Sequence, residues 1–146
     1  MYSTSIKAGP GYFSFIYNDD GVVESFFEDE ASFGLMASND FGKGILGILR
    51  EYFEEGKELP DVKLLGKLSN FQKDVYSLVR NIPSGETRSY GEIVAPNYAR
   101  AVGTAMAKNN HALFVPCHRV VGGKNKLCYR WGGKWKEFLL EVEKLI

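Results

Sequence analysis

One segment of the chain, Phe114-Val115-Pro116-Cys117-His118-Arg119-Val120-Val121, places a nucleophile beside two basic side chains. A cysteine reacts as its thiolate, and an adjacent imidazole or guanidinium favours that charged form. Because His118 and Arg119 follow Cys117 directly, the sequence predicts a reactive cysteine. Two other interpretations remain open: a structural cysteine in a buried strand, and a Cys-His hydrolase, which would also need a third, orienting group.

The cysteine and histidine content limits the other chemistry that the chain can perform. It has two cysteines and two histidines, with no C-x-x-C pair. We therefore expect no disulfide framework, no metal site and no cofactor. Both cysteines should be thiols in a reducing compartment. The second one, Cys128, is interpreted as a small buried apolar residue.

The net charge of zero conceals a division of charge along the chain. Residues 1–62 carry 4 basic and 12 acidic side chains (4 − 12 = −8), and residues 63–146 carry 14 and 6 (14 − 6 = +8). Such a division indicates a second half that binds a polyanion, unless the charges are merely scattered over solvated faces. The basic residues between Glu86 and Lys136 are Arg88, Arg100, Lys108, Arg119, Lys124, Lys126, Arg130, Lys134 and Lys136.

The overall composition is that of a globular protein. The chain has 146 residues, of which 45% are hydrophobic and 25% charged, enough for one ordinary domain or two small ones. Its apolar runs are shorter than the roughly 20 residues that span a bilayer. Its N-terminus lacks the basic flank and apolar core of a signal peptide. We therefore expect an intracellular, cytoplasmic protein with no membrane contact.

The elements that must position Cys117 fall into two units. In the first, residues 12–17 and 22–27 are aromatic and β-branched runs on either side of Asn18-Asp19-Asp20-Gly21, which predicts a β-hairpin. The Asp-Gly pair is expected to supply the positive φ of its turn. A helical apolar spacing over Phe41–Phe53 and a break at 56–61 then predict a small acidic α+β unit over residues 1–62.

The second unit, residues 63–146, is predicted to be mostly helical. Ser69-Asn70-Phe71-Gln72 has the pattern of a capping box, and Phe71, Val75, Leu78 and Ile82 recur on one face of the helix that it begins. The last helix is expected to begin at Lys134. Its inward-facing residues should be Trp135, Phe138, Leu139, Val142 and Ile146.

Between these helices the sequence predicts a helix-turn-helix. A short helix over 90–94, a break over 95–97 and a second helix over 98–108 have the required lengths. The second helix is rich in small residues. Taken alone, this pattern is also compatible with two helices that serve only packing.

Several motifs at matching spacing resemble the O6-alkylguanine-DNA alkyltransferases, the methylated-DNA–protein-cysteine methyltransferase family. They cover residues 68–146 in order and without large gaps. The motifs are Pro116-Cys117-His118-Arg119-Val120, Phe71-Gln72, Val75-Tyr76, Ile82-Pro83-Ser84-Gly85-Glu86-Thr87, Ser89-Tyr90-Gly91-Glu92-Ile93, Ala99-Arg100-Ala101-Val102-Gly103, Asn109, Tyr129, Gly132, Lys136, Leu139-Leu140 and Glu143. The resemblance implies an α+β fold, with an N-terminal unit that is ribonuclease H-like by analogy and a winged-helix-like C-terminal unit.

The resemblance also implies a role for each residue of the reactive centre. Cys117 would accept an alkyl group from O6 of guanine, once and irreversibly. His118 would act through a water as base toward the thiol, and Glu143 would orient the imidazole. Asn109 would tie down the turn before the active-site segment. Tyr90 would donate a hydrogen bond to N3 of the guanine as negative charge develops.

A base can be reached only outside the stack, so the resemblance implies base flipping in double-stranded DNA. The protein would act as a monomer through the minor groove, with Arg100 replacing the flipped nucleotide in the stack. The other expected DNA contacts are Ser89, Ala99, Ala101, Gly103 and Arg119.

The expected substrate pocket is lined by Met106, Val120, Tyr129, Arg130 and Trp131. Trp131 is bulky where some family members have glycine, so it should narrow the pocket and favour methyl over benzyl transfer. Asn110 stands where proline usually follows the hinge asparagine, which predicts a less rigid turn.

Two functions of other classes share these features. An alkyltransferase-like protein binds the damaged base but lacks the acceptor cysteine, so the presence of Cys117 argues against it. A helix-turn-helix regulator that senses alkylation through Cys117 usually carries a further effector domain, and 146 residues leave little room for one.

Overall fold

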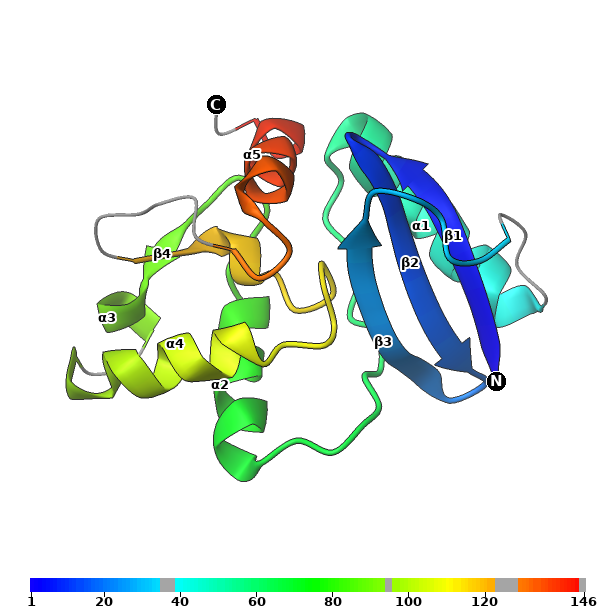
Figure 1. Cartoon of the computed structure of the whole chain (residues 1–146). Coiled ribbons are helices and arrows are strands. Elements are labelled where there is room, and N and C mark those ends of the chain that lie inside the picture. Colours follow the sequence, from blue (N-terminus) through cyan, green and yellow to red (C-terminus); the bar gives the residue numbers. More distant parts are fainter. Residues whose placement is uncertain (35–38, 94–95, 123–128, 145–146) are drawn as a thin grey trace.

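The structure is a computed structural model of the chain, and it describes residues 1–34, 39–93, 96–122 and 129–144 (Figure 1). Cys128 lies outside the described residues, as do the predicted helix end at Val94, part of the predicted break at Ala95, and Ile146. The elements are β1 (Tyr2–Ala8), β2 (Gly11–Asn18), β3 (Gly21–Glu28), α1 (Asp40–Glu55), α2 (Asn70–Arg80), β4 (Arg88–Ser89), α3 (Tyr90–Ile93), η1 (Pro96–Tyr98), α4 (Ala99–Ala107), η2 (Cys117–Arg119), β5 (Val120–Val121) and α5 (Gly133–Val142).

An antiparallel sheet in the order β1-β2-β3 occupies one side of the molecule (Figure 1). The predicted hairpin is confirmed, because β2 pairs with β3 and Tyr17 lies opposite Val22. Strand β1 was not predicted. It pairs with β2 along its whole length, from Tyr2 opposite Tyr17 to Ala8 opposite Gly11.

The turn of the hairpin differs from the expectation. Gly21 does not have a positive φ. Instead, Asn18 Oδ1 accepts hydrogen bonds from the backbone N–H groups of Asp20 at 2.7 Å and Gly21 at 3.2 Å, so the asparagine side chain closes the turn. Glycine is required at 21 for packing, since a Cβ there would lie 2.3 Å from the carbonyl oxygen of Lys63.

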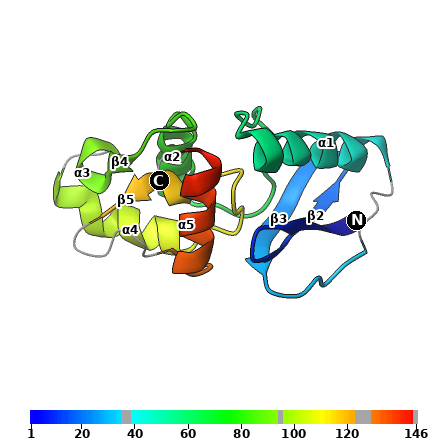
Figure 2. The same ribbon diagram turned by 90° about the horizontal axis from the view of Figure 1, so that it is seen from above.

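Helix α1 lies along one face of the sheet (Figure 2). Asn39 begins it by accepting a hydrogen bond from Gly42 N at 2.9 Å, and Gly56, with φ of 70°, ends it. The predicted helix over 41–53 is therefore confirmed. The residues that α1 and β2 bury against each other include Ile45, Leu46, Leu49, Tyr52, Phe13 and Phe15, so the two elements share one hydrophobic core.

Helix α2 begins with the predicted capping box, in which Ser69 and Gln72 exchange hydrogen bonds of 2.9 and 3.1 Å. The predicted buried face is only partly right. Phe71 and Leu78 are 39% and 43% exposed, although Val75 and Ile82 are buried. The buried stripe of α2 is Val75, Tyr76 and Val79, so the helix is rotated relative to the face chosen from the sequence.

The predicted helix-turn-helix is present as α3, η1 and α4, and α4 is one residue shorter at each end than expected. Helix α3 contacts α4. Strand β4, just before α3, pairs in parallel with β5, with Arg88 opposite Val120 and Ser89 opposite Val121. This pairing joins the start of the helix-turn-helix to the segment that follows Cys117.

The C-terminal helix, α5, lies between the sheet side and the helical side of the molecule (Figures 1 and 2). The prediction that Trp135 and Leu139 face inward is confirmed, and Phe138 and Val142 are half-buried. One hydrophobic core joins α5 and residues 112–114 to the sheet and α1, and a second core surrounds α2, α4 and Cys117. The N-terminal unit therefore shares its core with C-terminal residues. Among the described residues, none of the helices has the length and apolar character to cross a membrane.

Candidate active site

A tight reversal of the chain delivers Cys117 to the start of η2. Val115 N donates to His111 O at 3.0 Å, and between them Leu113 adopts φ of 72° while almost fully buried. A left-handed conformation costs a non-glycine residue about 1–2 kcal/mol. The burial of Leu113 in the core around the sheet offsets this strain.

Asn109 fixes the two ends of this reversal. Its Oδ1 accepts a hydrogen bond from His111 N at 2.9 Å, and its Nδ2 donates to Val115 O at 3.3 Å and to Cys117 Sγ at 3.3 Å. The side chain that the resemblance assigned to the turn therefore also touches the sulfur.

The resting thiol is not held as a thiolate by a neighbouring cation. Burial raises the pKa of Cys117, which is 6% exposed. The hydrogen bond from Asn109 acts in the opposite direction, as do Tyr129 and Lys136. The Tyr129 hydroxyl is buried without a partner at hydrogen-bonding geometry, yet it lies close enough to the sulfur to favour the thiolate.

The expectation that His118 or Arg119 would supply positive charge is wrong for the resting site. Burial lowers the pKa of His118, which is therefore a neutral imidazole at neutral pH. The charge of Arg119 is committed to Glu143 instead. The buried imidazole fits the role of a base that removes the thiol proton better than that of a fixed cation.

Glu143 is the charged centre of this region. It accepts hydrogen bonds from His118 Nε2 at 2.7 Å, from Arg119 at 3.0 Å on both oxygens, and from the Tyr52 hydroxyl. Burial alone raises the pKa of Glu143, but the hydrogen bonds and charges of His118 and Arg119 lower it to about 2. The carboxylate is therefore ionised, and it holds the imidazole with its proton on Nε2.

Arg119 does not occupy the DNA-binding position expected for it. Its side chain is 3% exposed, and it donates to Glu143, to Glu58 Oε1 at 3.0 Å and to Ile82 O at 2.7 Å. A guanidinium that is buried and bonded on every side has no surface to offer a phosphate. The predicted DNA contact at Arg119 is therefore wrong. Its buried guanidinium instead forms ion pairs with both Glu143 and Glu58.

A cavity of about 180 Å³ opens beside the sulfur. Of the five residues expected to line the pocket, Met106, Val120, Tyr129 and Arg130 do so, and Trp131 does not. The full lining is Tyr90, Gly103, Met106, Ala107, Cys117, Val120, Tyr129 and Arg130. The predicted nucleophile, the pocket and the Tyr90 ring therefore converge.

Trp131 does not line the cavity but packs against two residues that do, Tyr129 and Arg130. Its ring lies 5.3 Å from Tyr129 and 5.2 Å from the guanidinium carbon of Arg130. Arg130 also donates to Asn109 O and, at 2.7 Å, to Asn110 Oδ1. This bond restrains the turn at the position where the absence of proline predicted greater flexibility.

Helix α4 exposes one cation and only some of its small residues. Arg100 and Ala101 are exposed on α4, whereas Ala99 and Gly103 are half-buried. Ser89 is a helix cap, since its Oγ accepts from Glu92 N at 3.3 Å and its N–H donates to Glu92 at 2.9 Å. Arg100 therefore has the freedom to contact DNA that Arg119 lacks.

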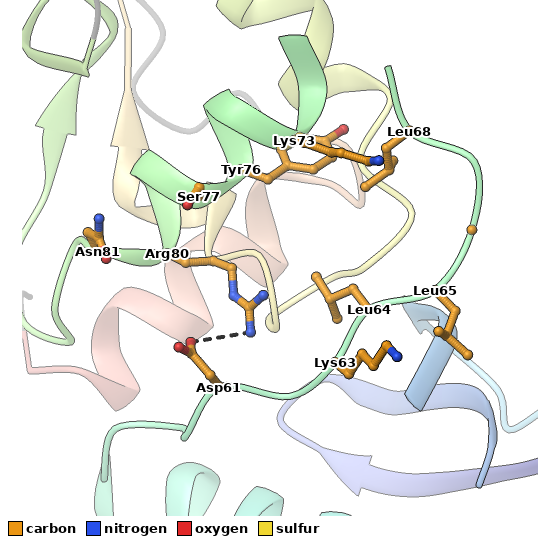
Figure 3. A pocket seen from close by; sticks show the side chains of 11 residues that line it. Asp61, Lys63, Leu64, Leu65, Leu68, Lys73, Tyr76, Ser77, Arg80 and Asn81 are labelled. Carbon is orange, nitrogen blue, oxygen red and sulfur yellow. Dashed lines mark ion pairs between the residues drawn. The ribbon is translucent and has the colours of Figure 1, made fainter. Parts of the chain in front are cut away.

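A larger cavity of about 530 Å³ lies between residues 61–68 and α2 (Figure 3). An ion pair of 3.3 Å between Asp61 and Arg80 closes one side of it. Neither cysteine nor histidine lines it, so it is not the site of the chemistry. Within the described residues, no cluster of three or more histidine, cysteine or acidic side chains is arranged to hold a metal ion.

Three residues near the site were not found from the sequence. Two of them belong to the N-terminal half: Tyr52 contacts Glu143, and Glu58 contacts Arg119. No local sequence pattern indicates that either residue lies near the site. Gly122 is required beside Tyr90, because a Cβ there would lie 2.6 Å from the tyrosine ring. A glycine directly after the short strand β5 was the one available signal of such a close approach.

The fold and the site together define a class: a helix-turn-helix protein that carries a candidate nucleophilic cysteine in a cavity beside α4. The family model described as "6-O-methylguanine DNA methyltransferase, DNA binding domain" matches residues 70–145 of this chain. The chain belongs to this family.

Individual relatives agree with this assignment. The methylated-DNA–protein-cysteine methyltransferase of Methanosarcina mazei is 43% identical over 111 residues, which cover 73% of this chain and 70% of that protein. The protein of the same name from Mycobacterium tuberculosis is 45% identical over 106 residues, covering 69% of this chain and 64% of that protein, slightly less than two thirds of its length.

Solved structures extend the similarity to the N-terminal half. The crystal structure of Mycobacterium tuberculosis O6-methylguanine methyltransferase has a TM-score of 0.82 and 33% identity, covering 99% of this chain and 93% of that chain. Mycobacterium tuberculosis OGT in complex with DNA gives the same two values, with coverages of 98% and 92%. The mixed α/β fold of this chain is that of these proteins.

Proposed function

We propose that this chain repairs DNA by direct reversal, with Cys117 accepting the alkyl group from O6 of guanine once and irreversibly. The observation that carries the proposal is the buried thiol at the cavity wall, next to an imidazole whose Nδ1 is buried without a hydrogen-bond partner. A buried acceptor nitrogen of this kind is suited to receive a proton. Membership of the family supports the same activity.

The reaction begins with removal of the thiol proton. Glu143 is ionised and only accepts hydrogen bonds, so His118 carries its proton on Nε2 and leaves Nδ1 as the base. A water between Cys117 Sγ and Nδ1 would pass the proton to the imidazole. Glu143 then stabilises the imidazolium that forms, as a buried carboxylate does for a catalytic histidine.

The transfer itself is a displacement at the alkyl carbon. The thiolate sulfur forms a bond to that carbon while the bond from carbon to O6 breaks, and the electron pair leaves with the oxygen. Negative charge spreads over the guanine, and Tyr90, which also lines the cavity, would donate a hydrogen bond to N3. The product is a thioether, which no group in the site can cleave.

The base must reach the cavity from a duplex. The proposed complex places α4 in the minor groove, where Ala99, Ala101 and Gly103 allow a close backbone approach and Arg100 fills the space of the flipped nucleotide. Ser89 would add a contact at the start of α3. Binding of this kind depends on phosphates and base extrusion, so it should be salt-sensitive and nearly independent of sequence.

Arg100→Ala is expected to slow transfer from duplex DNA about tenfold or more, because unstacking a base costs a few kcal/mol that the side chain would offset. Transfer from free O6-methylguanine base should keep the parent rate. Single-turnover kinetics on both substrates test this, with Lys108→Ala, at the C-cap of the same helix, as the control. If Arg100→Ala repaired the duplex at the parent rate, the role of the side chain in base flipping would be wrong.

Methyl transfer is expected to exceed benzyl transfer about tenfold or more, since forcing bulk into a packed wall costs about 1–3 kcal/mol. Arg130 forms that wall and is held by Asn109, Asn110 and Trp131. Trp131 would thus act through Arg130 rather than by filling the cavity. Rates on oligonucleotides with O6-methylguanine and O6-benzylguanine measure the ratio, and equal rates would remove the basis for this expectation.

We assign residues 1–62 to a structural unit, ribonuclease H-like by analogy, and residues 63–146 to a winged-helix-like unit for DNA binding and alkyl transfer. The protein would act as a monomer in the cytoplasm. Because the acceptor thiol is present in the cavity, a binding protein without transfer activity is not favoured.

Intact-mass spectrometry tests the proposal. After incubation with an O6-methylguanine duplex, the protein should gain one methylene group, mapped to the peptide that contains Cys117. Unmodified DNA is the control. A folded, reduced protein whose Cys117 peptide stays unmodified would contradict the proposed function.

A further inference from the structure

A single oxygen of Glu143 is shared by three hydrogen-bond donors. Oε2 accepts from His118 Nε2 at 2.7 Å, from Arg119 at 3.0 Å and from the Tyr52 hydroxyl. The first two donors lie next to Cys117 in the chain, whereas Tyr52 lies on α1 of the N-terminal half, 91 residues from Glu143. This contact brings a residue of the sheet-bearing side to the carboxylate that holds the His118 imidazole.

Tyr52 is placed firmly enough to act on Glu143. Its side chain is fully buried, and its ring packs edge-on against Phe53 at 5.3 Å. Burial, with the neighbouring Glu143, raises its pKa well above 10.0, so the hydroxyl remains protonated and donates. Helix α1 also contacts α5, the helix that ends at Glu143.

Donors that share one carboxylate oxygen compete for its charge. Each bond that Oε2 accepts lowers the electron density left for the others, so a donor from Tyr52 weakens the hold of Glu143 on the imidazole. A weaker hold stabilises the imidazolium less and makes His118 a weaker base. Removing the Tyr52 hydroxyl should therefore make His118 more basic.

We propose that Tyr52 is a positioning residue of the transfer reaction, which shares Glu143 Oε2 with His118 and thereby sets the basicity of that imidazole. This inference rests on the proposed function, because it assigns the N-terminal half a part in the same proton transfer. It gives α1 a role beyond support of the C-terminal unit.

Other charged and titratable groups also face His118, and they stay in place when Tyr52 is changed. From η2 this is Arg119, from α5 and its C-cap these are Lys136 and Glu143, and the Tyr129 ring lies 6.4 Å away, edge to face. Glu58 reaches this group only through Arg119. The variant of Tyr52 therefore changes one donor in a fixed set.

The test is Tyr52→Phe, which keeps the buried ring and removes the hydroxyl. In single-turnover transfer the acid limb of the pH–rate profile should move to higher pH by roughly half a pH unit or more. The His118 imidazole should titrate upward by the same amount in NMR spectra, which are simple because the chain has only two histidines. Tyr17→Phe is the matched control, since it removes another hydroxyl from a fully buried tyrosine in the same hydrophobic core, and it should move neither.

The outcomes separate the inference from the function on which it rests. A uniformly slower Tyr52→Phe with an unmoved acid limb and an unmoved His118 titration would overturn the inference. If the variant failed to fold, 3-fluorotyrosine at position 52 keeps the packing and donates more strongly, so it should move both readouts to lower pH; no movement would overturn the inference. The NMR titration needs no transfer, so it remains decisive if the parent protein proves inactive, which would contradict the proposed function alone.

Discussion

Cys117→Ala is expected to abolish alkyl transfer while the protein still binds alkylated duplex DNA. The sulfur is the atom that forms the new bond. The other nucleophilic groups among the described lining residues are the Met106 thioether and the Tyr90 and Tyr129 hydroxyls, which are far weaker than a thiolate at neutral pH. The turn should survive, because Asn109 keeps its hydrogen bonds to Val115 O and from His111 N. Removing one buried sulfur costs about 1 kcal/mol of stability by the usual price of a small cavity.

Two measurements on the same samples check this expectation. Intact mass after incubation with an O6-methylguanine duplex should show no added methylene, and fluorescence anisotropy should give an affinity close to the parent value. Cys117→Ser is the matched control, since its hydroxyl can still form hydrogen bonds but does not ionise to a nucleophile near neutral pH. Transfer that persisted in Cys117→Ala and mapped to Cys128 would show that Cys117 is not the acceptor.

Helix α1 and the start of α2 could be predicted because their signals are local. The capping box at Ser69 and Gln72 and the helical spacing before Phe53 are set by neighbouring residues in the chain, and both predictions are confirmed. The pocket residues Met106 and Val120 came from the family resemblance, and both line the cavity. Local spacing therefore predicted the helices, whereas the pocket residues were predicted only by the family resemblance.

Strand β1 escaped prediction because its buried groups are polar. Thr4 and Ser5 are fully buried, so the strand lacks the apolar alternation that indicates a half-buried sheet. Thr4 donates to Gly34 O at 2.9 Å, and Ser5 exchanges a hydrogen bond of 2.7 Å with Ser14 on β2. These hydrogen-bond partners come from other parts of the chain, so the sequence of residues 2–8 alone does not predict them.

The error at Arg119 has a related cause. A basic residue beside a reactive cysteine in a basic half of the chain reads equally as a DNA contact or as an internal ion pair. The choice depends on Glu58 and Glu143, which lie 61 and 24 residues away in sequence. A buried guanidinium needs partners on several sides, and only the folded arrangement shows that both carboxylates meet it.

Glu143→Gln is expected to destabilise the protein at neutral pH by about 3 kcal/mol and to remove part of its sensitivity to acid. The folded protein lowers the pKa of Glu143 from its ordinary value of 4.5 to about 2. A carboxyl that binds its proton more weakly in the folded state than in the unfolded state stabilises the fold while it is ionised. That contribution is complete above pH 4.5 and falls as the pH drops toward 2.

Urea unfolding at a series of pH values isolates this contribution. The parent free energy of unfolding should fall steeply below pH 4.5, whereas Glu143→Gln, having no carboxyl to protonate, should fall less over that range. The control Glu137→Gln changes an exposed carboxyl on the same helix, α5, and should follow the parent.

His118 adds a separate dependence at higher pH. Its pKa is lowered by burial from 6.5, so its neutral form stabilises the fold above that pH, and this contribution is lost as the pH falls below it. The imidazole is present in both proteins. Without the carboxylate its pKa is lowered further, because Glu143 favours the protonated form. The free energy of unfolding that is lost when His118 must be protonated should therefore be larger in Glu143→Gln. The two curves should therefore diverge between pH 6.5 and 4.5 and converge below 4.5. Parallel curves would mean that the buried carboxylate does not couple the imidazole and Arg119 to the stability of the fold.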